Sequence, residues 1–158
     1  MTREQSRERL QGLGLPGVAM RIFDGPVPHP ALRDTCDNPE HVFAPGTQLP
    51  PKDIIPLWES GVRVTAIESG PPPVRFVRFS LERPDEVEVL GTSFQSAAAD
   101  VLIELWELER NDDILKAVGD LFEFQHLPRL LTECSQRPRH EPYEEYRAWR
   151  SRFLASCT

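Results

Sequence analysis

The side chains best suited to chemistry gather in the proline-rich stretch 26–51. It contains carboxylates, a thiol and an imidazole, namely Asp34, Cys36, Asp37, Glu40 and His41. Oxygen and imidazole groups at such spacing are ligands for a divalent metal ion, and a thiol beside an imidazole can act as nucleophile and base. However, short acidic residues in such loops commonly cap turns, and acidic neighbours raise the pKa of a thiol. The sequence therefore predicts no metal, no cofactor and no catalytic residue, and a small enzyme that uses this loop remains an alternative.

The rest of the chain adds no catalytic motif. Its serines lack a G-x-S-x-G context and its glycines do not form a phosphate-binding pattern. The cysteines Cys36, Cys134 and Cys157 are odd in number and show no C-x-x-C spacing, which is atypical of a disulfide framework or a zinc site. This cysteine usage fits a reducing compartment, so we expect a cytoplasmic protein that is not an enzyme.

The formal net charge of −7 over 158 residues limits the classes of partner. Nucleic-acid binding requires clustered Lys and Arg, so nucleic acid is not expected. No run approaches the roughly 20 apolar residues that a membrane span needs, and the charged start of the chain does not resemble a signal peptide. A basic protein suits this charge best, because complementary charge speeds association, although an acidic balance also simply favours solubility.

Two groups of residues are candidates for a partner-binding surface. One is acidic and the other is an aromatic face near the C-terminus; together they comprise Glu82, Asp85, Glu86, Glu88, Asp112, Asp113, Tyr143, Tyr146 and Trp149. Aromatic residues are enriched at interface hot spots, whereas charged runs are by default solvated surface. The aromatic face has two open interpretations, because it can pack on its own domain or dock a partner. Trp58 and Trp106 are expected in the core.

The elements that must position these residues predict an α+β fold. A small, mainly antiparallel sheet of about four to five strands is flanked by helices, and the C-terminal half is helical. The expected strands are Val18–Phe23, Asp53–Trp58, Val62–Ile67, Arg75–Leu81 and Glu86–Leu90. The expected helices are Thr2–Leu13, Phe94–Glu109, Asp112–Phe124, Pro128–Cys134 and Pro142–Ala155. Residues 1–135 are predicted to form one domain, and 136–158 a linker with an amphipathic helix that packs on it.

Proline restricts two parts of this prediction. Pro56 cannot occupy a central position of a sheet, so its segment is expected at an edge or a bend. The stretch 26–51 is expected to be a long ordered loop, held in place by packing of Val42, Phe43 and Leu49.

A pattern of structural residues over about 45–110 resembles the SUKH superfamily. It runs through Leu57-Trp58-Glu59-Ser60-Gly61, Val64-Thr65-Ala66, Phe76-Val77-Arg78-Phe79-Ser80-Leu81-Glu82 and Thr92-Ser93-Phe94-Gln95. The resemblance implies an α+β domain with a twisted sheet bordered by helices, and a non-enzymatic role. Many bacterial members of that superfamily are immunity proteins that neutralise a cognate toxin, and no catalytic or binding residue carries over.

The leading hypothesis is therefore a non-enzymatic protein-binding domain, an immunity protein whose partner is a basic toxin domain. A housekeeping scaffold module of the same fold is the alternative. The oligomeric state does not follow from the sequence.

Overall fold

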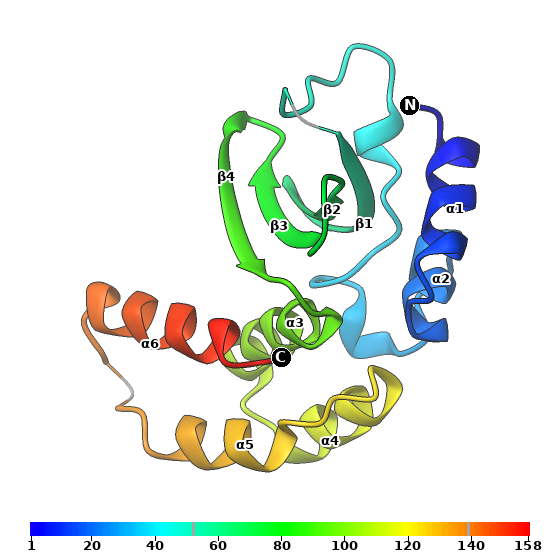
Figure 1. Cartoon of the computed structure of the whole chain (residues 1–158). Helices are drawn as coiled ribbons and strands as arrows, with labels where there is room; N and C mark the ends of the chain where they lie inside the picture. The colour runs from blue at the N-terminus through cyan, green and yellow to red at the C-terminus, as the bar shows by residue number, and fades with distance from the viewer. Residues whose placement is uncertain (52, 139) are drawn as a thin grey trace.

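The computed structural model describes residues 1–51, 53–138 and 140–158. Four antiparallel strands form one sheet in the order β1-β2-β3-β4 (Figure 1). The strands are β1 (Ile54–Ser60), β2 (Arg63–Glu68), β3 (Arg75–Ser80) and β4 (Arg83–Gly91). The predicted α+β class is confirmed, with helices making up the C-terminal half of the chain.

The sheet is a meander with tight turns at 61–62 and 81–82 and a longer connection at 69–74. β1 and β2 meet at Gly61, whose φ of 59° is a left-handed conformation that glycine adopts without strain. β2 and β3 then pair in continuous antiparallel register. Pro56 lies in β1, an edge strand whose pairing with β2 is irregular between Pro56 and Trp58. The prediction that this proline restricts its segment to an edge strand is confirmed.

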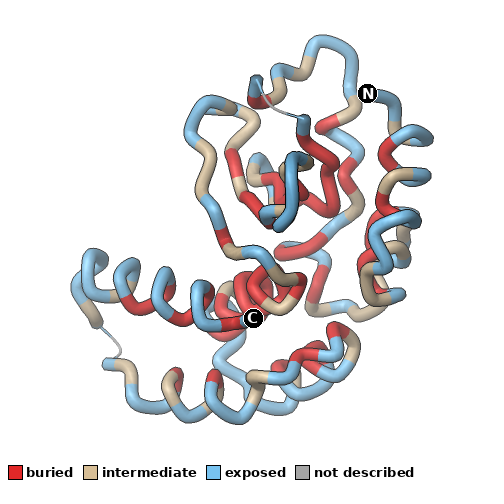
Figure 2. Tube along the Cα trace, in the orientation of Figure 1, coloured by how far each residue is buried: buried red, intermediate tan, exposed pale blue. Residues whose placement is uncertain are grey.

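Helix α3 connects the sheet to the other helices. It packs against β3, β4, α4 and α6, and Figure 2 shows its buried residues in the middle of the molecule. Ser93 begins it, because its side chain accepts a hydrogen bond from the Gln95 N–H at 3.0 Å. The helices are α1 (Arg3–Gly12), α2 (Gly17–Asp24), α3 (Phe94–Glu109), α4 (Asp112–Leu121), α5 (Leu127–Ser135) and α6 (Tyr143–Ala155).

The segment Val18–Phe23, predicted as the first strand, forms helix α2 instead. Its buried residues are Val18, Ala19, Ile22 and Phe23, a spacing that places all of them on one face of a helix. In a strand, successive side chains point to opposite faces, so the same four could not be buried together on one face. Because α2 packs against α1 and β1, the helix buries the whole set.

The stretch 26–51 is a loop that covers one face of the sheet. It contains two short 3-10 turns, Pro30–Leu32 and His41–Phe43. Val42 is buried in a cluster with sheet residues such as Val64 and Phe79. The partly buried side chains of Phe43 and Leu49 pack against that cluster, which confirms that packing holds the loop in place.

The C-terminal helix packs on its own chain. α6 contacts α3 and β4, and the C-terminus lies beside α3 (Figure 1). The hydroxyl of Ser96 in α3 donates a 2.9 Å hydrogen bond to the carbonyl of Cys157. β3, β4, α3 and α6 therefore meet in one place, where charged side chains from all four elements gather.

Candidate functional site

A hollow of about 870 Å³ opens where β3, β4, α3 and α6 meet, and we call it the charged cleft. Five arginines and five acidic residues line it. The acidic residues Asp100, Glu104 and Glu107 follow one another on a single face of α3, because they are spaced four and three residues apart. The arginines come from the strands and from α6, so opposite charges face each other across the cleft.

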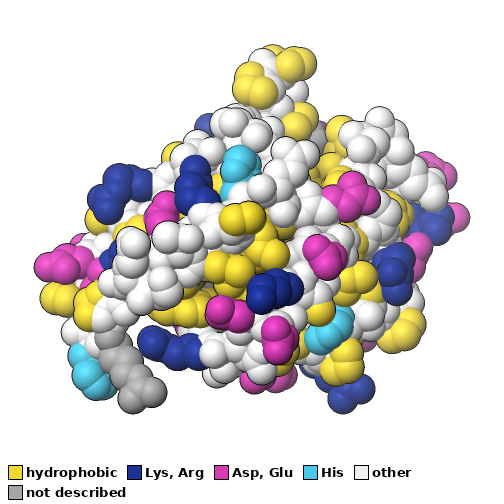
Figure 3. All heavy atoms as spheres, turned by 90° about the horizontal axis from the view of Figure 1, so that it is seen from below, with side chains coloured by type: hydrophobic (Ala, Val, Ile, Leu, Met, Phe, Trp, Pro, Cys, Tyr) yellow, Lys and Arg dark blue, Asp and Glu magenta, His cyan; other side chains and the backbone are white. Residues whose placement is uncertain are grey.

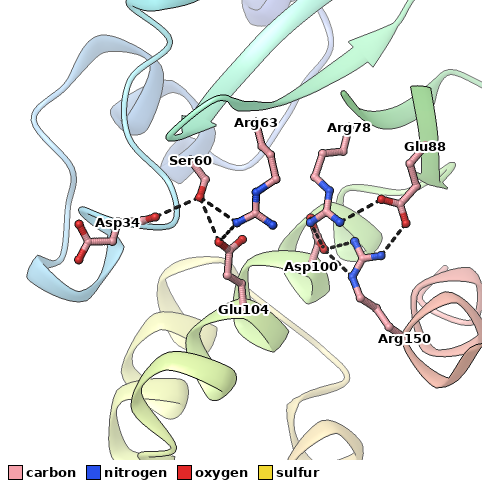
Figure 4. Close-up of polar contacts among 8 residues, drawn as sticks. All are labelled: Asp34, Ser60, Arg63, Arg78, Glu88, Asp100, Glu104 and Arg150. Atoms are coloured by element: carbon pink, nitrogen blue, oxygen red, sulfur yellow. Dashed lines mark hydrogen bonds and ion pairs between the residues drawn. The ribbon is translucent and has the colours of Figure 1, made fainter. Parts of the chain in front are cut away.

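Inside the charged cleft, two arginines and two carboxylates form a partly buried network (Figure 4). Asp100, 4% exposed, accepts hydrogen bonds from Arg78 Nη1 at 3.1 and 3.0 Å. It also accepts from Arg150 Nε at 3.1 Å and from Arg150 Nη2. Glu88 accepts from Arg78 Nη2 at 3.0 Å and from Arg150 Nη1 at 2.5 Å. One connected network thus ties β3, β4, α3 and α6 together.

The charges of this network reinforce one another. Burial alone would raise the pKa of Glu88, but the adjacent Arg78 and Arg150 outweigh burial, so the pKa of Glu88 is lowered. The pKa of Arg150 is raised because Asp100 and Glu88 outweigh its own burial. Both shifts favour the ionised forms of Glu88 and Arg150.

A second carboxylate group lies next to the network. Glu104 pairs with Arg63 and accepts a 3.0 Å hydrogen bond from the hydroxyl of Ser60. Ser60 Oγ also lies 3.0 Å from the carbonyl of Asp34, which connects β1 to the loop (Figure 4). Burial raises the pKa of Glu104 and outweighs the opposing effect of Arg63. The pKa of Glu88 is therefore lowered and that of Glu104 is raised, although both residues line the charged cleft.

The mouth of the charged cleft is aromatic on one side and acidic on the other. Tyr143 and Tyr146 of α6 line it, and Tyr143 is 69% exposed. Burial raises the pKa of Tyr146, and the nearby carboxylate of Glu107 in α3 raises it further. Here an exposed ring, a half-buried ring and an exposed carboxylate lie at the entrance of one hollow.

A second hollow, of about 550 Å³, lies on the other side of the β3–β4 turn, and we call it the hairpin hollow. Glu82 and Asp85 line it, together with Leu49 of the loop. Arg83 and Glu86 line both hollows and form a 3.0 Å ion pair on the surface. The first half of β4 is therefore a ridge between two hollows, and its exposed side chains are mostly acidic.

The remaining candidate residues lie elsewhere. Asp112 and Asp113 form the first turn of α4, after the cap at Asn111, and line neither hollow. Trp149 is 4% exposed, and its Nε1 donates a 2.7 Å hydrogen bond to Glu133 of α5. This indole is therefore part of the packing between α5 and α6 rather than an exposed contact residue.

The described residues on the underside of the molecule, where α4 and α5 lie, carry charges of both signs. In Figure 3, acidic and basic side chains are interspersed around a central group of apolar ones on this face. Among the described residues, Glu82, Asp85 and Glu86 lie together beside the hairpin hollow.

The structure does not assemble the nucleophile and base considered in the loop. Cys36 is fully buried, and its pKa is raised well above the ordinary value by burial, with further contributions from Glu104, Asp37 and Asp100. His41 Nδ1 instead lies 2.8 Å from Glu59 Oε2, and this hydrogen bond raises the pKa of the imidazole. Among the described residues, no group of three or more His, Cys, Asp or Glu side chains could hold a metal ion.

Sequence reasoning missed Arg63, Arg78, Asp100, Arg147 and Arg150 as lining residues of the cleft. Two signals were present. Arg78 continues the period-2 alternation of Phe76, which is buried in the core. Asp100 interrupts the wide apolar stripe of α3. A charged residue at an inward position requires a buried partner of opposite charge. The sequence pattern was therefore compatible with a pairing of Arg78 and Asp100, which the structure shows.

Comparisons of the chain with known protein families, with curated proteins and with solved structures found no match in any of the three. No helix in the described part of the chain has the length and apolar character needed to cross a membrane. The β4 ridge and the two hollows beside it are therefore the features that bear on function.

Proposed function

We propose that this chain is a non-enzymatic protein-binding domain of the SUKH type, and that it acts in the cytoplasm as an immunity protein against a basic toxin domain. One observation carries the proposal: the β4 ridge and its two hollows bring together most of the residues proposed for partner binding. They are Glu82, Asp85, Glu86, Glu88, Tyr143 and Tyr146. These residues come from a strand turn and a distant helix, yet they share one surface.

The chemistry of this surface favours a basic protein. Glu82, Asp85 and Glu86 are exposed on the ridge, and the chain carries a formal charge of −7. A field of this sign attracts a cationic partner and raises its association rate. The exposed ring of Tyr143 offers the kind of amphipathic contact that is enriched at interface hot spots.

The order of the elements agrees with the SUKH resemblance. The quoted residues fall on β1, on the β2–β3 hairpin and on the capped start of α3, in that sequence. In the proposed mechanism, the ridge enters the concave active site of the toxin. It would then exclude substrate by its bulk, while its carboxylates pair with the basic residues that the toxin uses for an anionic substrate.

Affinity capture tests the proposal. Tagged protein is incubated with lysate of its native host in moderate salt, and the bound proteins are identified and quantified by mass spectrometry. The test variant carries Glu82→Lys, Asp85→Lys and Glu86→Lys. The matched control carries Glu4→Lys, Glu8→Lys and Asp120→Lys, which makes the same change in net charge at exposed positions outside both hollows.

We expect one basic toxin-like protein in near-equal amount with the wild type and the control, and its loss with the ridge variant. Equal capture by all three chains would refute the ridge as the binding surface. A specifically bound housekeeping protein would support the scaffold alternative, and failure to capture any protein across repeated growth phases would count against both.

A further inference from the structure

The mouth of the charged cleft has the features of a receptor for one cationic side chain. We propose that Tyr143, Tyr146 and Glu107 receive an arginine side chain of the partner, which stacks on the tyrosine rings and pairs with the carboxylate. This proposal deepens the proposed function, on which it rests, because it names the chemical group that the partner presents at that surface.

The carboxylates of the cleft differ in their partners. Within the cleft, Glu88 and Asp100 are each paired with both Arg78 and Arg150. Glu104 is likewise paired with Arg63. Glu107 differs from them, because no described arginine forms an ion pair with it, and the neighbouring group that it influences is the neutral hydroxyl of Tyr146. A neutral hydroxyl does not take the place of a cation, so the carboxylate of Glu107 is open to pairing with an incoming guanidinium.

The exposed aromatic surface of Tyr143 also favours a guanidinium as the ligand. The guanidinium carbons of Arg110, Arg129 and Arg137 lie over aromatic rings in the helical half of the chain, at 4.7, 4.3 and 4.5 Å from the ring centroids. The rings are those of Trp106, Phe153 and Trp149. Tyr143 is not covered in this way by any described arginine, and the residue is 69% exposed. An external guanidinium would complete the same arrangement at the cleft mouth.

Further charged side chains lie near Tyr143 in α6. Glu144 and Glu145 lie beside Tyr143 in the first turn of α6, and Arg147 is the nearby cation that also lines the cleft. Neither Glu144 nor Glu145 lines the cleft, but both add negative charge beside Tyr143, near the carboxylate of Glu107, and negative charge there favours an incoming cation. A planar guanidinium suits the mouth better than an ammonium, because the guanidinium can stack on a ring while its edge donates to a carboxylate.

Amide-resolved NMR titration of the full chain tests this inference. The probe is N-acetyl-arginine amide, and the control ligand is N-acetyl-citrulline amide, which has nearly the same shape and no charge. We expect saturable shifts at the amides of Tyr143, Tyr146 and Glu107 with the arginine probe only. Glu107→Gln should abolish saturation, whereas Glu109→Gln, on the exposed end of the same helix, should preserve it. Tyr143→Phe should also preserve binding, whereas Tyr143→Leu should weaken it about two- to five-fold.

Identical shifts with the citrulline control, shifts confined to other surfaces, or equal effects of Glu107→Gln and Glu109→Gln would overturn the inference. Its failure is distinguishable from failure of the proposed function. If the wild-type chain captures a basic protein and the Glu107→Gln and Tyr143→Leu variants capture it equally well, the protein-binding role stands and the arginine site does not.

Discussion

At the scale of single residues, the charged cleft is defined by carboxylates and arginines that pair with one another while buried or partly buried. Burying an ion is costly, and an ion pair repays this cost only where hydrogen bonds satisfy both partners. Asp100 accepts from two arginines, and Arg150 donates to two carboxylates, so each group is satisfied by several others. The network therefore fixes how α6 sits on β4 and α3, and removing one member should be severe.

Asp100→Ala tests this expectation. It leaves Arg78 and the 6%-exposed Arg150 with Glu88 as their shared partner, so the free energy of unfolding should fall by about 3–5 kcal/mol. Urea denaturation measures the change. Arg83→Ala removes an ion pair in which both side chains are more than 60% exposed, and it should cost about 1 kcal/mol or less. Equal effects of the two substitutions would show that the buried network does not fix the position of α6.

Glu104 gives the cleft a pH dependence of definite sign. Its pKa in the folded chain is raised above the ordinary 4.5, chiefly by burial. The folded state therefore binds its proton more tightly than the unfolded state, and stability is lost as the pH rises from about 4.5 through the folded pKa. Relative to the wild type, Glu104→Gln should gain stability over that interval. Urea titrations from pH 4 to 7 check this, with Glu109→Gln as the exposed control. A difference that does not change with pH would contradict the assignment.

The residues of the candidate site were only partly predictable. Surface charge and aromatic character indicated Glu86, Glu88, Tyr143 and Tyr146, because exposure follows from polar patterning. The partners of Glu88 were not predictable as partners, because Arg78 and Arg150 meet it only after the sheet and α6 pack. Trp149 illustrates the opposite limit. Tyr143 and Trp149 belong to the same helix, yet Tyr143 is exposed and Trp149 is buried. Aromatic type alone therefore does not distinguish a contact residue from a core residue.

At the scale of elements, the strongest patterns predicted the structure best. The bounds of α3 agree with the sequence because its apolar stripe is long and Ser93 caps its start. β4 extends beyond the predicted Glu86–Leu90 to Arg83–Gly91, because backbone pairing with β3 recruits polar residues that carry no strand signal. The α2 segment was misread for a related reason: a short apolar run fits both periodicities, and packing against α1 and β1 decides between them.

The loop 26–51 is an element without regular structure, and a single buried carboxylate holds much of it. Glu59 is 3% exposed and accepts a 2.7 Å hydrogen bond from the N–H of Val42. The backbones of Asp37 and Glu59 also exchange two hydrogen bonds of 2.8 Å at the outer edge of β1. The loop thus depends on β1 for its position, as β1 depends on the loop to cover its edge.

Glu59→Ala should release the loop locally. The substitution leaves the N–H of Val42 buried without its acceptor, which costs about 1–3 kcal/mol. We expect faster amide exchange at Val42 and faster proteolysis within 26–51, measured by mass spectrometry under native conditions. Glu59→Gln retains an acceptor oxygen, so it should preserve more of the protection. Unchanged cleavage in the alanine variant would mean that the apolar cluster around Val42 holds the loop without this carboxylate.

At the scale of the whole molecule, one apolar core joins the sheet to the C-terminal helices. Trp58 in β1, Trp106 in α3 and Trp149 in α6 are 1%, 8% and 4% exposed and belong to the same buried cluster. The ring of Trp58 packs edge-on against Phe94 of α3, at 6.2 Å between centroids, and against Phe122, at 5.9 Å. Trp106 packs against Trp149 at 6.4 Å. Burial on both sides of α3 is therefore continuous, and α6 should not unfold on its own.

This continuity predicts a single cooperative transition for the full chain. In urea, tryptophan fluorescence, near-UV circular dichroism and far-UV circular dichroism should give the same midpoint, because each tryptophan reports a different part of one core. Trp149→Phe removes the reporter on α6 while retaining an aromatic ring, and the remaining signals should again coincide with one another. If fluorescence of the wild type changed at lower urea than the far-UV signal, and that early phase vanished in Trp149→Phe, then α6 would be a separate unit. The charged cleft would in that case open before the sheet unfolds, and a partner bound at its mouth would stabilise α6 selectively.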